Sequence, residues 1–163
     1  MVRTCPTVGR KVPGPRMIFG AVVAALLVAV GGCAAEVPAP TPNAATAKTC
    51  RSLVSALPQI VDQQRHREVE PASDFTAAWG HPAITLACGV TKPAGMNAAS
   101  KCWEVNGVGW YAEERDSDIR YTTLGRTALV QVTVPNKYTP QANALVDLAA
   151  PIKSQVPVVR TCV

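Results

Sequence analysis

Histidines, aromatic residues and catalytic motifs are scarce in this chain of 163 residues. It has only two histidines, His66 and His81, and 5% of its residues are aromatic. No Gly-x-Ser-x-Gly or Ser-x-x-Lys sequence supplies an activated serine for acyl transfer. No cysteine pair has the Cys-x-x-Cys spacing of a zinc site, and no glycine-rich loop leads to the lysine that phosphate binding needs. We therefore predict no metal, no cofactor and no catalytic residue, and we favour a protein that is not an enzyme.

The excess of basic residues lies almost wholly in the first sixteen residues. The formal net charge is +5, but Arg3, Arg10, Lys11 and Arg16 supply four of the sixteen basic side chains. After Cys33, twelve basic residues stand against eleven acidic ones, a balance of +1. Nucleic-acid binding needs a clustered basic face, so we predict no nucleic-acid partner.

An uncharged run over residues 17–30 follows the basic segment and has the profile of a secretory signal peptide. It closes on Val30-Gly31-Gly32-Cys33, which resembles the lipobox of bacterial lipoproteins. By that resemblance, residues 1–32 are removed and Cys33 is lipidated, which anchors the chain to the extracytoplasmic face of the cell membrane. An uncleaved span is the alternative, because the nineteen uncharged residues 17–35 are long enough to cross a bilayer.

The segment after the signal is rich in proline and alanine and shows no apolar periodicity. We therefore predict a flexible tether over residues 33–48. Residues 49–163 have the size of one domain. Four cysteines remain in it, and in an oxidising compartment they are expected to form two disulfides: Cys50, Cys88, Cys102 and Cys162.

Two helices are predicted in this domain. After Thr49, apolar residues recur at helical spacing from Cys50 to Leu57, and Pro58 ends that helix. Thr139-Pro140 has the N-cap and first-turn proline of a second helix. Its expected buried stripe consists of Leu145, Leu148, Ala149 and Ile152.

Alternating apolar residues predict strands over residues 83–90 and 127–134. Between them, Asn106-Gly107 is typical of a type I′ hairpin turn, although a single bulged strand is an alternative. With residues 110–114 and 119–124, these segments form an antiparallel meander. The predicted fold class is α+β, with two layers: an antiparallel sheet of four to five strands and two helices packed on one face.

Three disulfide pairings are open to four cysteines. The strand over residues 83–90 turns Cys88 into the core, where the helix face bearing Cys50 must also pack. A second bond from Cys102 to Cys162 would tie down the C-terminal tail. We therefore favour Cys50 with Cys88 and Cys102 with Cys162.

Aromatic residues concentrate between residues 103 and 138. Trp110 and Tyr111 lie on opposite faces of one strand, so one of them is expected to be exposed. Beside Arg120 or Arg126, an exposed ring could stack on a sugar or a peptide. These four residues are the candidate binding site for an envelope protein or a cell-wall ligand, and we predict a non-enzymatic binding or assembly domain.

A hydrolase acting on cell-wall material is the alternative function. Paired carboxylates of the glycosidase type could be drawn from the acidic residues around the predicted turn at residues 115–118. Acids that flank a turn are also common on solvated hairpins. The candidates are Glu104, Glu113, Glu114, Asp116 and Asp118.

Several motifs in a fixed order resemble an actinobacterial family of small exported proteins and lipoproteins that carry a domain of unknown function. The resemblance covers residues 49–155 and implies location and domain type but no activity. It also implies the Cys50–Cys88 pairing, because family members often keep these two cysteines alone. Where the family is often acidic, this chain has His81. The motifs are Cys50-x-x-Leu53-x-x-Ala56-Leu57-Pro58, Ala78-Trp79-Gly80-His81-Pro82-Ala83-Ile84, Cys88-Gly89-Val90, Val105-Asn106-Gly107-Val108-x-Trp110, Thr122-Thr123-x-Gly125-Arg126 and Val130-x-Val132-x-Val134-Pro135.

Overall fold

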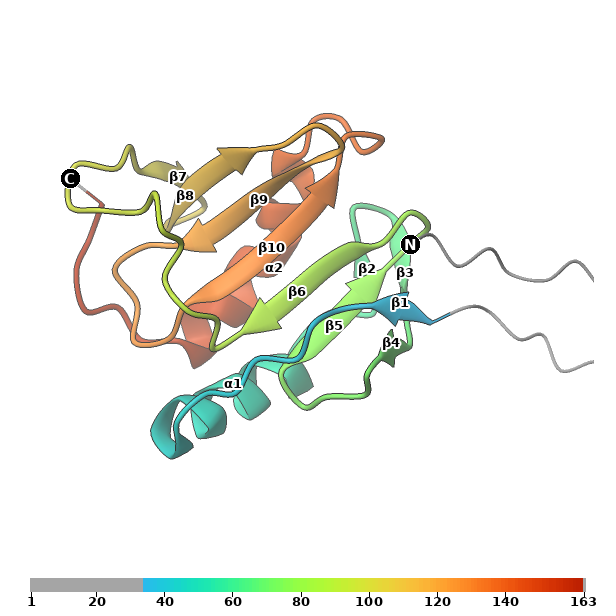
Figure 1. Cartoon of the computed structure of the whole chain (residues 1–163), viewed down its shortest axis with the longest axis horizontal. Helices are drawn as coiled ribbons and strands as arrows, with labels where there is room; N and C mark the ends of the chain where they lie inside the picture. Colours follow the sequence, from blue (N-terminus) through green and yellow to red (C-terminus); the bar gives the residue numbers. More distant parts are fainter. Residues whose placement is uncertain (1–33, 163) are drawn as a thin grey trace, which may run out of the picture. The chain divides into compact units, whose positions relative to one another are not determined.

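The computed structural model describes residues 34–162, which form an α+β domain with two helices and a large antiparallel sheet (Figure 1). The signal segment and Cys33 lie outside the described residues. In chain order the elements are β1 (Ala35–Glu36), α1 (Ala44–Ser55), β2 (Ile60–Val61), β3 (Gln64–Arg67), β4 (Val69–Glu70), β5 (Thr76–Trp79), β6 (Ile84–Cys88), β7 (Trp103–Val105), β8 (Val108–Glu114), β9 (Asp118–Thr123), β10 (Val130–Pro135) and α2 (Ala142–Gln155).

The main sheet has eight strands in the order β2-β3-β5-β6-β10-β9-β8-β7, not the four to five that we predicted. The meander of β7 to β10 is confirmed, but three strands on the other side were missed. In β3, the sequence Gln-Arg-His-Arg has no apolar alternation. In β5, all four residues are buried, so one face cannot be told from the other by polarity. Pairing with β6, rather than sequence pattern, identifies β5 as a strand.

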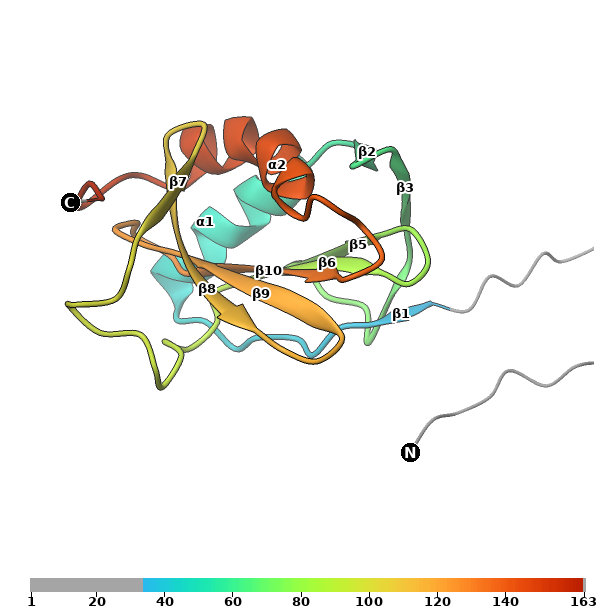
Figure 2. The same cartoon turned by 90° about the horizontal axis from the view of Figure 1, so that it is seen from above.

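Both helices cover one face of this sheet (Figure 2). Helix α1 begins at Ala44, earlier than predicted, because the Asn43 side chain accepts a hydrogen bond from Thr46 N–H at 3.0 Å and acts as the N-cap. Helix α2 begins at Ala142 and continues past Pro151 to Gln155. Its predicted buried stripe is confirmed, with Leu145, Leu148, Ala149 and Ile152 all at most 2% exposed.

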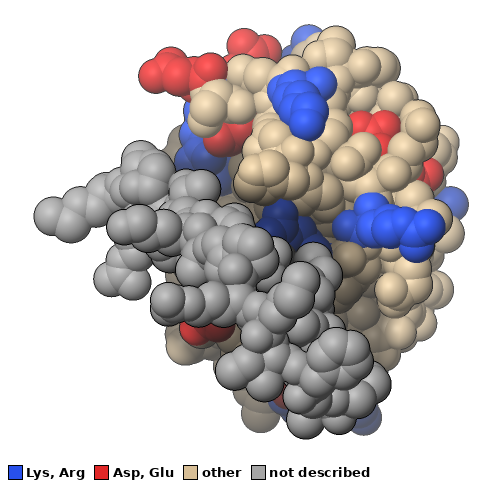
Figure 3. Space-filling model, turned by 90° about the vertical axis from the view of Figure 1, so that its right-hand side faces the viewer, with Lys and Arg blue, Asp and Glu red and all other residues tan. Residues whose placement is uncertain are grey.

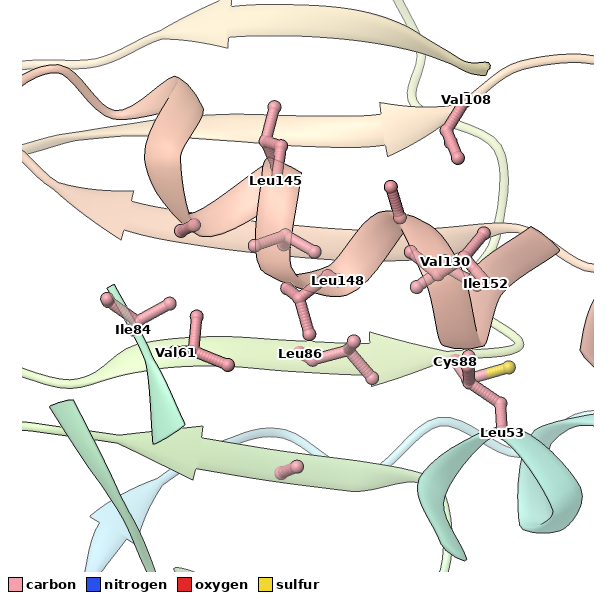
Figure 4. Packing of buried hydrophobic residues seen from close by; sticks show 14 of the residues in the cluster. Leu53, Val61, Ile84, Leu86, Cys88, Val108, Val130, Leu145, Leu148 and Ile152 are labelled. Carbon is pink, nitrogen blue, oxygen red and sulfur yellow. The ribbon is translucent and has the colours of Figure 1, made fainter. Parts of the chain in front are cut away.

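The core lies between the helices and the inner face of the sheet (Figure 4). Val130, Val132 and Val134 of β10 point into it, as the alternation predicted, and are fully buried. Leu86 of β6 and Leu148 of α2 lie near its centre in Figure 4. Burial of such apolar side chains contributes about 1.5–3 kcal/mol each, so this layer supplies most of the favourable free energy of folding.

The hairpin and both disulfide pairings are confirmed. Asn106 and Gly107 have φ values of 49° and 80°, as a type I′ turn between β7 and β8 requires. The Cys50–Cys88 disulfide joins α1 to β6, with Cα atoms 5.4 Å apart. The Cys102–Cys162 disulfide ties the C-terminal tail to the segment before β7, with Cα atoms 5.8 Å apart.

Residues 34–43, which we call the N-terminal strap, are ordered along the sheet, whereas we predicted a flexible tether as far as residue 48. Ala35 N–H donates to the Glu68 carbonyl at 2.9 Å, and Val37 N–H donates to the Glu70 carbonyl at 3.0 Å. Val37 is 3% exposed because it packs on small residues of β5 and β6. The strap crosses the face of the sheet opposite the helices (Figures 1 and 2). Tertiary contacts thus order a segment whose own sequence shows no periodicity.

Gly89 allows the end of the strap to lie close to β6. Its φ is +85°, and a Cβ built on it would lie 2.7 Å from Cβ of Pro42. Any other residue would therefore meet both backbone strain and a clash.

Within residues 34–162, neither helix is long and apolar enough to cross a membrane.

Candidate functional site

The helix-free face of the sheet carries a row of polar side chains across four neighbouring strands. Side chains alternate between the two faces of a strand, so the residues that lie between the core valines of β10 point away from the helices. The pairing register aligns Thr85 of β6 with Thr133 of β10, Thr133 with Arg120 of β9, and Arg120 with Glu113 of β8. Neighbouring strands are about 4.8 Å apart, so this polar row is about 14 Å long.

A groove of about 960 Å³ lies over this row. The polar row forms its floor. Residues 36–41 of the strap form one wall, and residues 89–94, the loop after β6, also line it. Its charged residues are three acids and three bases: Glu36, Glu113, Asp118, Lys92, Arg115 and Arg120. The groove therefore has polar groups at its base and no formal excess of either charge.

Arg115 and Asp118 form an internally satisfied ion pair at one end of the groove. Arg115 Nε donates to Asp118 Oδ1 at 2.7 Å, and a second guanidinium nitrogen donates to Oδ2 at 2.8 Å. Ser117 Oγ also donates to Oδ2 at 3.0 Å. The hydrogen bonds from Arg115 lower the pKa of the Asp118 carboxyl. This pair holds the turn between β8 and β9 and keeps Asp118 ionised.

Glu113 and Arg120 differ from that pair, because each has an unbonded polar atom. They are directly opposite in the register of β8 and β9. Among the described residues, however, neither makes an ion pair, and Glu113 Oε2 and Arg120 Nε are shielded from solvent without a hydrogen-bond partner. An unsatisfied buried polar group costs about 1–3 kcal/mol. A ligand that accepts from Arg120 and donates to Glu113 would recover that free energy if the two side chains change rotamer, because both unbonded atoms are shielded from solvent.

The four predicted binding residues do not form one site. Trp110 is fully buried in the core, where its ring meets Tyr121 edge to face with centroids 6.4 Å apart. Arg126 is 7% exposed, and its guanidinium donates to backbone carbonyl groups of Val156 and Gly107 at 2.7 and 3.0 Å. Burial lowers the pKa of this guanidinium. Trp110 and Arg126 are therefore parts of the folded scaffold.

Tyr111 and Arg120 do lie on the helix-free face. Tyr111 is opposite Thr122 in the register and is half-buried. Loop residue Gly95 lies over it, since a Cβ built on Gly95 would be 2.6 Å from the Tyr111 hydroxyl oxygen. Arg120 lines the groove itself. Alternation along β8 correctly placed Trp110 and Tyr111 on opposite faces, but only the fold shows which face is open and that Arg120 lies on it.

Neither histidine joins a carboxylate in this groove. The ring of His66 packs edge to face on Trp79, with centroids 5.8 Å apart. His81 Nδ1 lies 3.3 Å from an Arg67 guanidinium nitrogen. Among residues 34–162, no group of three or more His, Cys, Asp or Glu side chains is arranged to hold a metal ion.

A smaller pocket of about 260 Å³ lies on the opposite side of β8 and β9, beside the start of α2. Tyr121 lines it, and burial raises the pKa of this phenol. Glu114, next to Glu113 in the chain, also lines this second pocket, because side chains alternate along β8. Glu114 thus makes a matched control for Glu113 on the other face.

Four parts of the groove were not predicted from the sequence: Thr85, Thr133, Lys92 and the strap. The two threonines occupy the polar positions of their alternating strands, which is the signal that marks an outward face. Nothing in the local sequence shows that the strap crosses this face. On the part of the described surface visible in Figure 3, acidic and basic side chains are interspersed, without a patch of one sign.

Comparison with protein families matches residues 16–161 to the family described as "Protein of unknown function (DUF3515)". Searches of curated proteins and of solved structures each found no significant match. The matched span contains every helix and strand described above. The chain therefore belongs to the DUF3515 family of proteins of unknown function.

Proposed function

We propose that this protein is an envelope lipoprotein, anchored through Cys33 on the extracytoplasmic face of the cell membrane, whose domain binds a ligand without chemical turnover. The observation that carries the binding role is the groove, where Glu113 and Arg120 lie opposite each other without partners among the described residues. The sequence Val30-Gly31-Gly32-Cys33 supports the anchor. Two disulfides in residues 34–162 support an oxidising location.

The size and chemistry of the groove favour binding of a small polar ligand or of part of a larger one. Its volume of about 960 Å³ falls in the range of ligand pockets, about 300–1,000 Å³. The floor residues lie on central strands, and a site built on strands is more rigid than one built on loops. A preformed site of this kind binds with little cost in conformational ordering.

A hydrolase that acts on cell-wall material is the second candidate, because two carboxylates, Glu113 and Asp118, line the same groove. General acid–base catalysis by two carboxylates needs one that stays protonated near neutral pH. Asp118 is unsuited to that role, since hydrogen bonds from Arg115 lower the pKa of its carboxyl. The proton donor would then have to be Glu36 or Glu113. Glu113 lies opposite the Arg120 guanidinium, which is a better arrangement for recognition than for proton transfer.

Cys33→Ala tests the anchor. We expect the variant to be released from the membrane or to accumulate as the uncleaved precursor, because the thioether to diacylglycerol cannot form. Fractionation followed by mass measurement of the chain checks this. The control replaces Cys102 and Cys162 together by alanine, which removes two other sulfur atoms without leaving a free thiol, and it should leave the protein in the membrane fraction. Unchanged size and membrane retention of Cys33→Ala would favour the uncleaved span.

Photocrosslinking in intact cells tests the groove. A photoreactive amino acid at Thr133, on the floor, should capture the ligand and give a discrete mass adduct. The same residue at Val146, which is 45% exposed on α2, is the control and should give none. Equal labelling at both positions would argue against a groove ligand. The mass of the adduct identifies the ligand. Incubation of the same compound, free in solution, with purified protein then separates the two candidate functions, because a hydrolase would cleave it and a binding protein would leave it intact.

A further inference from the structure

The strap places the groove close to the expected anchor. Only Ala34 lies between Cys33 and β1, and the groove wall begins at Glu36. A chain extends at most about 3.4 Å per residue, so the Cα atoms of Cys33 and Glu36 are no more than about 10 Å apart. In a lipoprotein this ordered strap would hold the groove at the level of the lipid headgroups. A long flexible tether would have carried it away from them.

The charges in the groove favour a ligand that is itself a zwitterion. Three acidic and three basic residues line the groove, so it does not select a ligand by net charge. Arg115 and Asp118 satisfy each other. Of the other four charged residues, Glu36 and Lys92 belong to the strap and the loop that line the groove. Arg120 and Glu113 lie on its floor, a donor and an acceptor on strands about 4.8 Å apart. Complementarity requires an anionic group and a hydrogen-bond-donating cation about one strand spacing apart in the ligand.

We propose that the groove binds the phosphoethanolamine headgroup of a membrane phospholipid. This inference rests on the proposed function, that is, on a lipid anchor at Cys33 and a groove that binds a ligand. The phosphate would accept hydrogen bonds from the Arg120 guanidinium, in the charge-assisted geometry typical of arginine and phosphate. The ammonium would donate to Glu113. The Thr133 hydroxyl, next to Arg120 in the register, would give the phosphate a further donor.

This pairing predicts discrimination between headgroups. A phosphocholine group has the same charges but no N–H, so it cannot donate to Glu113. A phosphoglycerol group has the phosphate but no cation, so Glu113 would receive at most the weaker hydrogen bond of a neutral hydroxyl, beside a like charge. Specificity of this kind arises because the wrong ligand leaves a polar group of the site unsatisfied.

The test uses the full lipoprotein, purified in a maltoside detergent, and native mass spectrometry with added phospholipid. We expect dioleoyl phosphatidylethanolamine to bind about tenfold or more tightly than dioleoyl phosphatidylcholine or phosphatidylglycerol. Glu113→Gln and Arg120→Gln should each weaken its binding by about tenfold, the effect of losing one charge-assisted hydrogen bond. Glu114→Gln, on the opposite face, is the matched control and should bind as the unmodified protein does.

Two results would overturn the inference. Equal binding of the ethanolamine and choline lipids would refute recognition of the headgroup. Soluble glycerophosphoethanolamine that binds as tightly as the lipid, by titration calorimetry, would refute a membrane source and assign the same chemistry to a free metabolite. Neither result would contradict the proposed function of a lipid-anchored binding domain. That proposal fails separately if the photoreactive residue at Thr133 captures no ligand, or if Cys33→Ala leaves membrane retention unchanged.

Discussion

Replacing Cys50 and Cys88 together by alanine should lower the free energy of unfolding by about 4 kcal/mol. The bond closes a loop of 38 residues, and the loss of that loop-closure constraint from the unfolded chain accounts for an effect of this size. Both residues are fully buried between α1 and β6, so the smaller side chains also lose packing. Urea unfolding followed by tryptophan fluorescence measures the change, since Trp79 and Trp110 are fully buried.

The second disulfide supplies the control for this prediction. Cys102 and Cys162 close a longer loop of 60 residues, but they are half-buried and lie beside the C-terminus. When that bond is absent, the tail can fray in the native state as well, which offsets part of the gain in unfolded-state entropy. The double alanine variant at these positions should therefore lose less than the Cys50 and Cys88 variant. An equal or larger loss would contradict the argument from burial.

Arg126→Met should destabilise the domain by about 2–4 kcal/mol. The guanidinium donates to the Val156 carbonyl at 2.7 Å at the end of α2 and to the Gly107 carbonyl at 3.0 Å in the hairpin turn. Methionine fills similar volume but donates nothing, so the carbonyl of buried Val156 loses its partner, at about 1–3 kcal/mol. The Gly107 carbonyl, in the exposed turn, loses a partner at a smaller cost. The effect should appear as a lower urea midpoint with an unchanged slope.

Arg120→Met is the matched control for that variant. It makes the same substitution at an arginine that forms no hydrogen bond or ion pair among the described residues. We expect no loss of stability and a gain of up to about 1–3 kcal/mol, because the substitution removes the buried, unbonded Nε of Arg120. Comparable losses at the two positions would show that arginine packing, rather than the bonds of Arg126, stabilises the domain.

The local periodicity of the sequence predicted the elements that have one polar and one apolar face. The valines of β10, the leucine stripe of α2 and the Asn106-Gly107 turn were all placed correctly, because each pattern reports its own burial or backbone angles. The larger sheet was not predictable in this way. Strand β3 is polar and lies next to the edge strand β2, and β5 is buried on both faces, so neither shows the alternation of a half-buried strand.

The candidate site was only half predictable. Alternation correctly placed Trp110 and Tyr111 on opposite faces of β8, yet it could not show which of them lies in the core. Nor could it show that Arg126, unlike Arg120, binds two carbonyl groups far away in the sequence. Hydrogen bonds between residues 19 and 30 positions apart leave no trace in a local pattern. For that reason an arginine that stabilises the scaffold and an arginine that lines the groove look alike in the sequence.

The sequence alone determined the two-layer α+β class and the faces of the half-buried strands, because spacing and polarity encode these properties locally. It favoured one of three cysteine pairings, and the structure shows that pairing. Only the tertiary structure decided the size of the sheet, the course of residues 34–43 and the existence of the groove. These depend on which backbone edges pair and on what lies over the small residues of β5 and β6. Such contacts join segments that lie far apart in the chain, and the local sequence of one segment does not indicate which other segment it contacts.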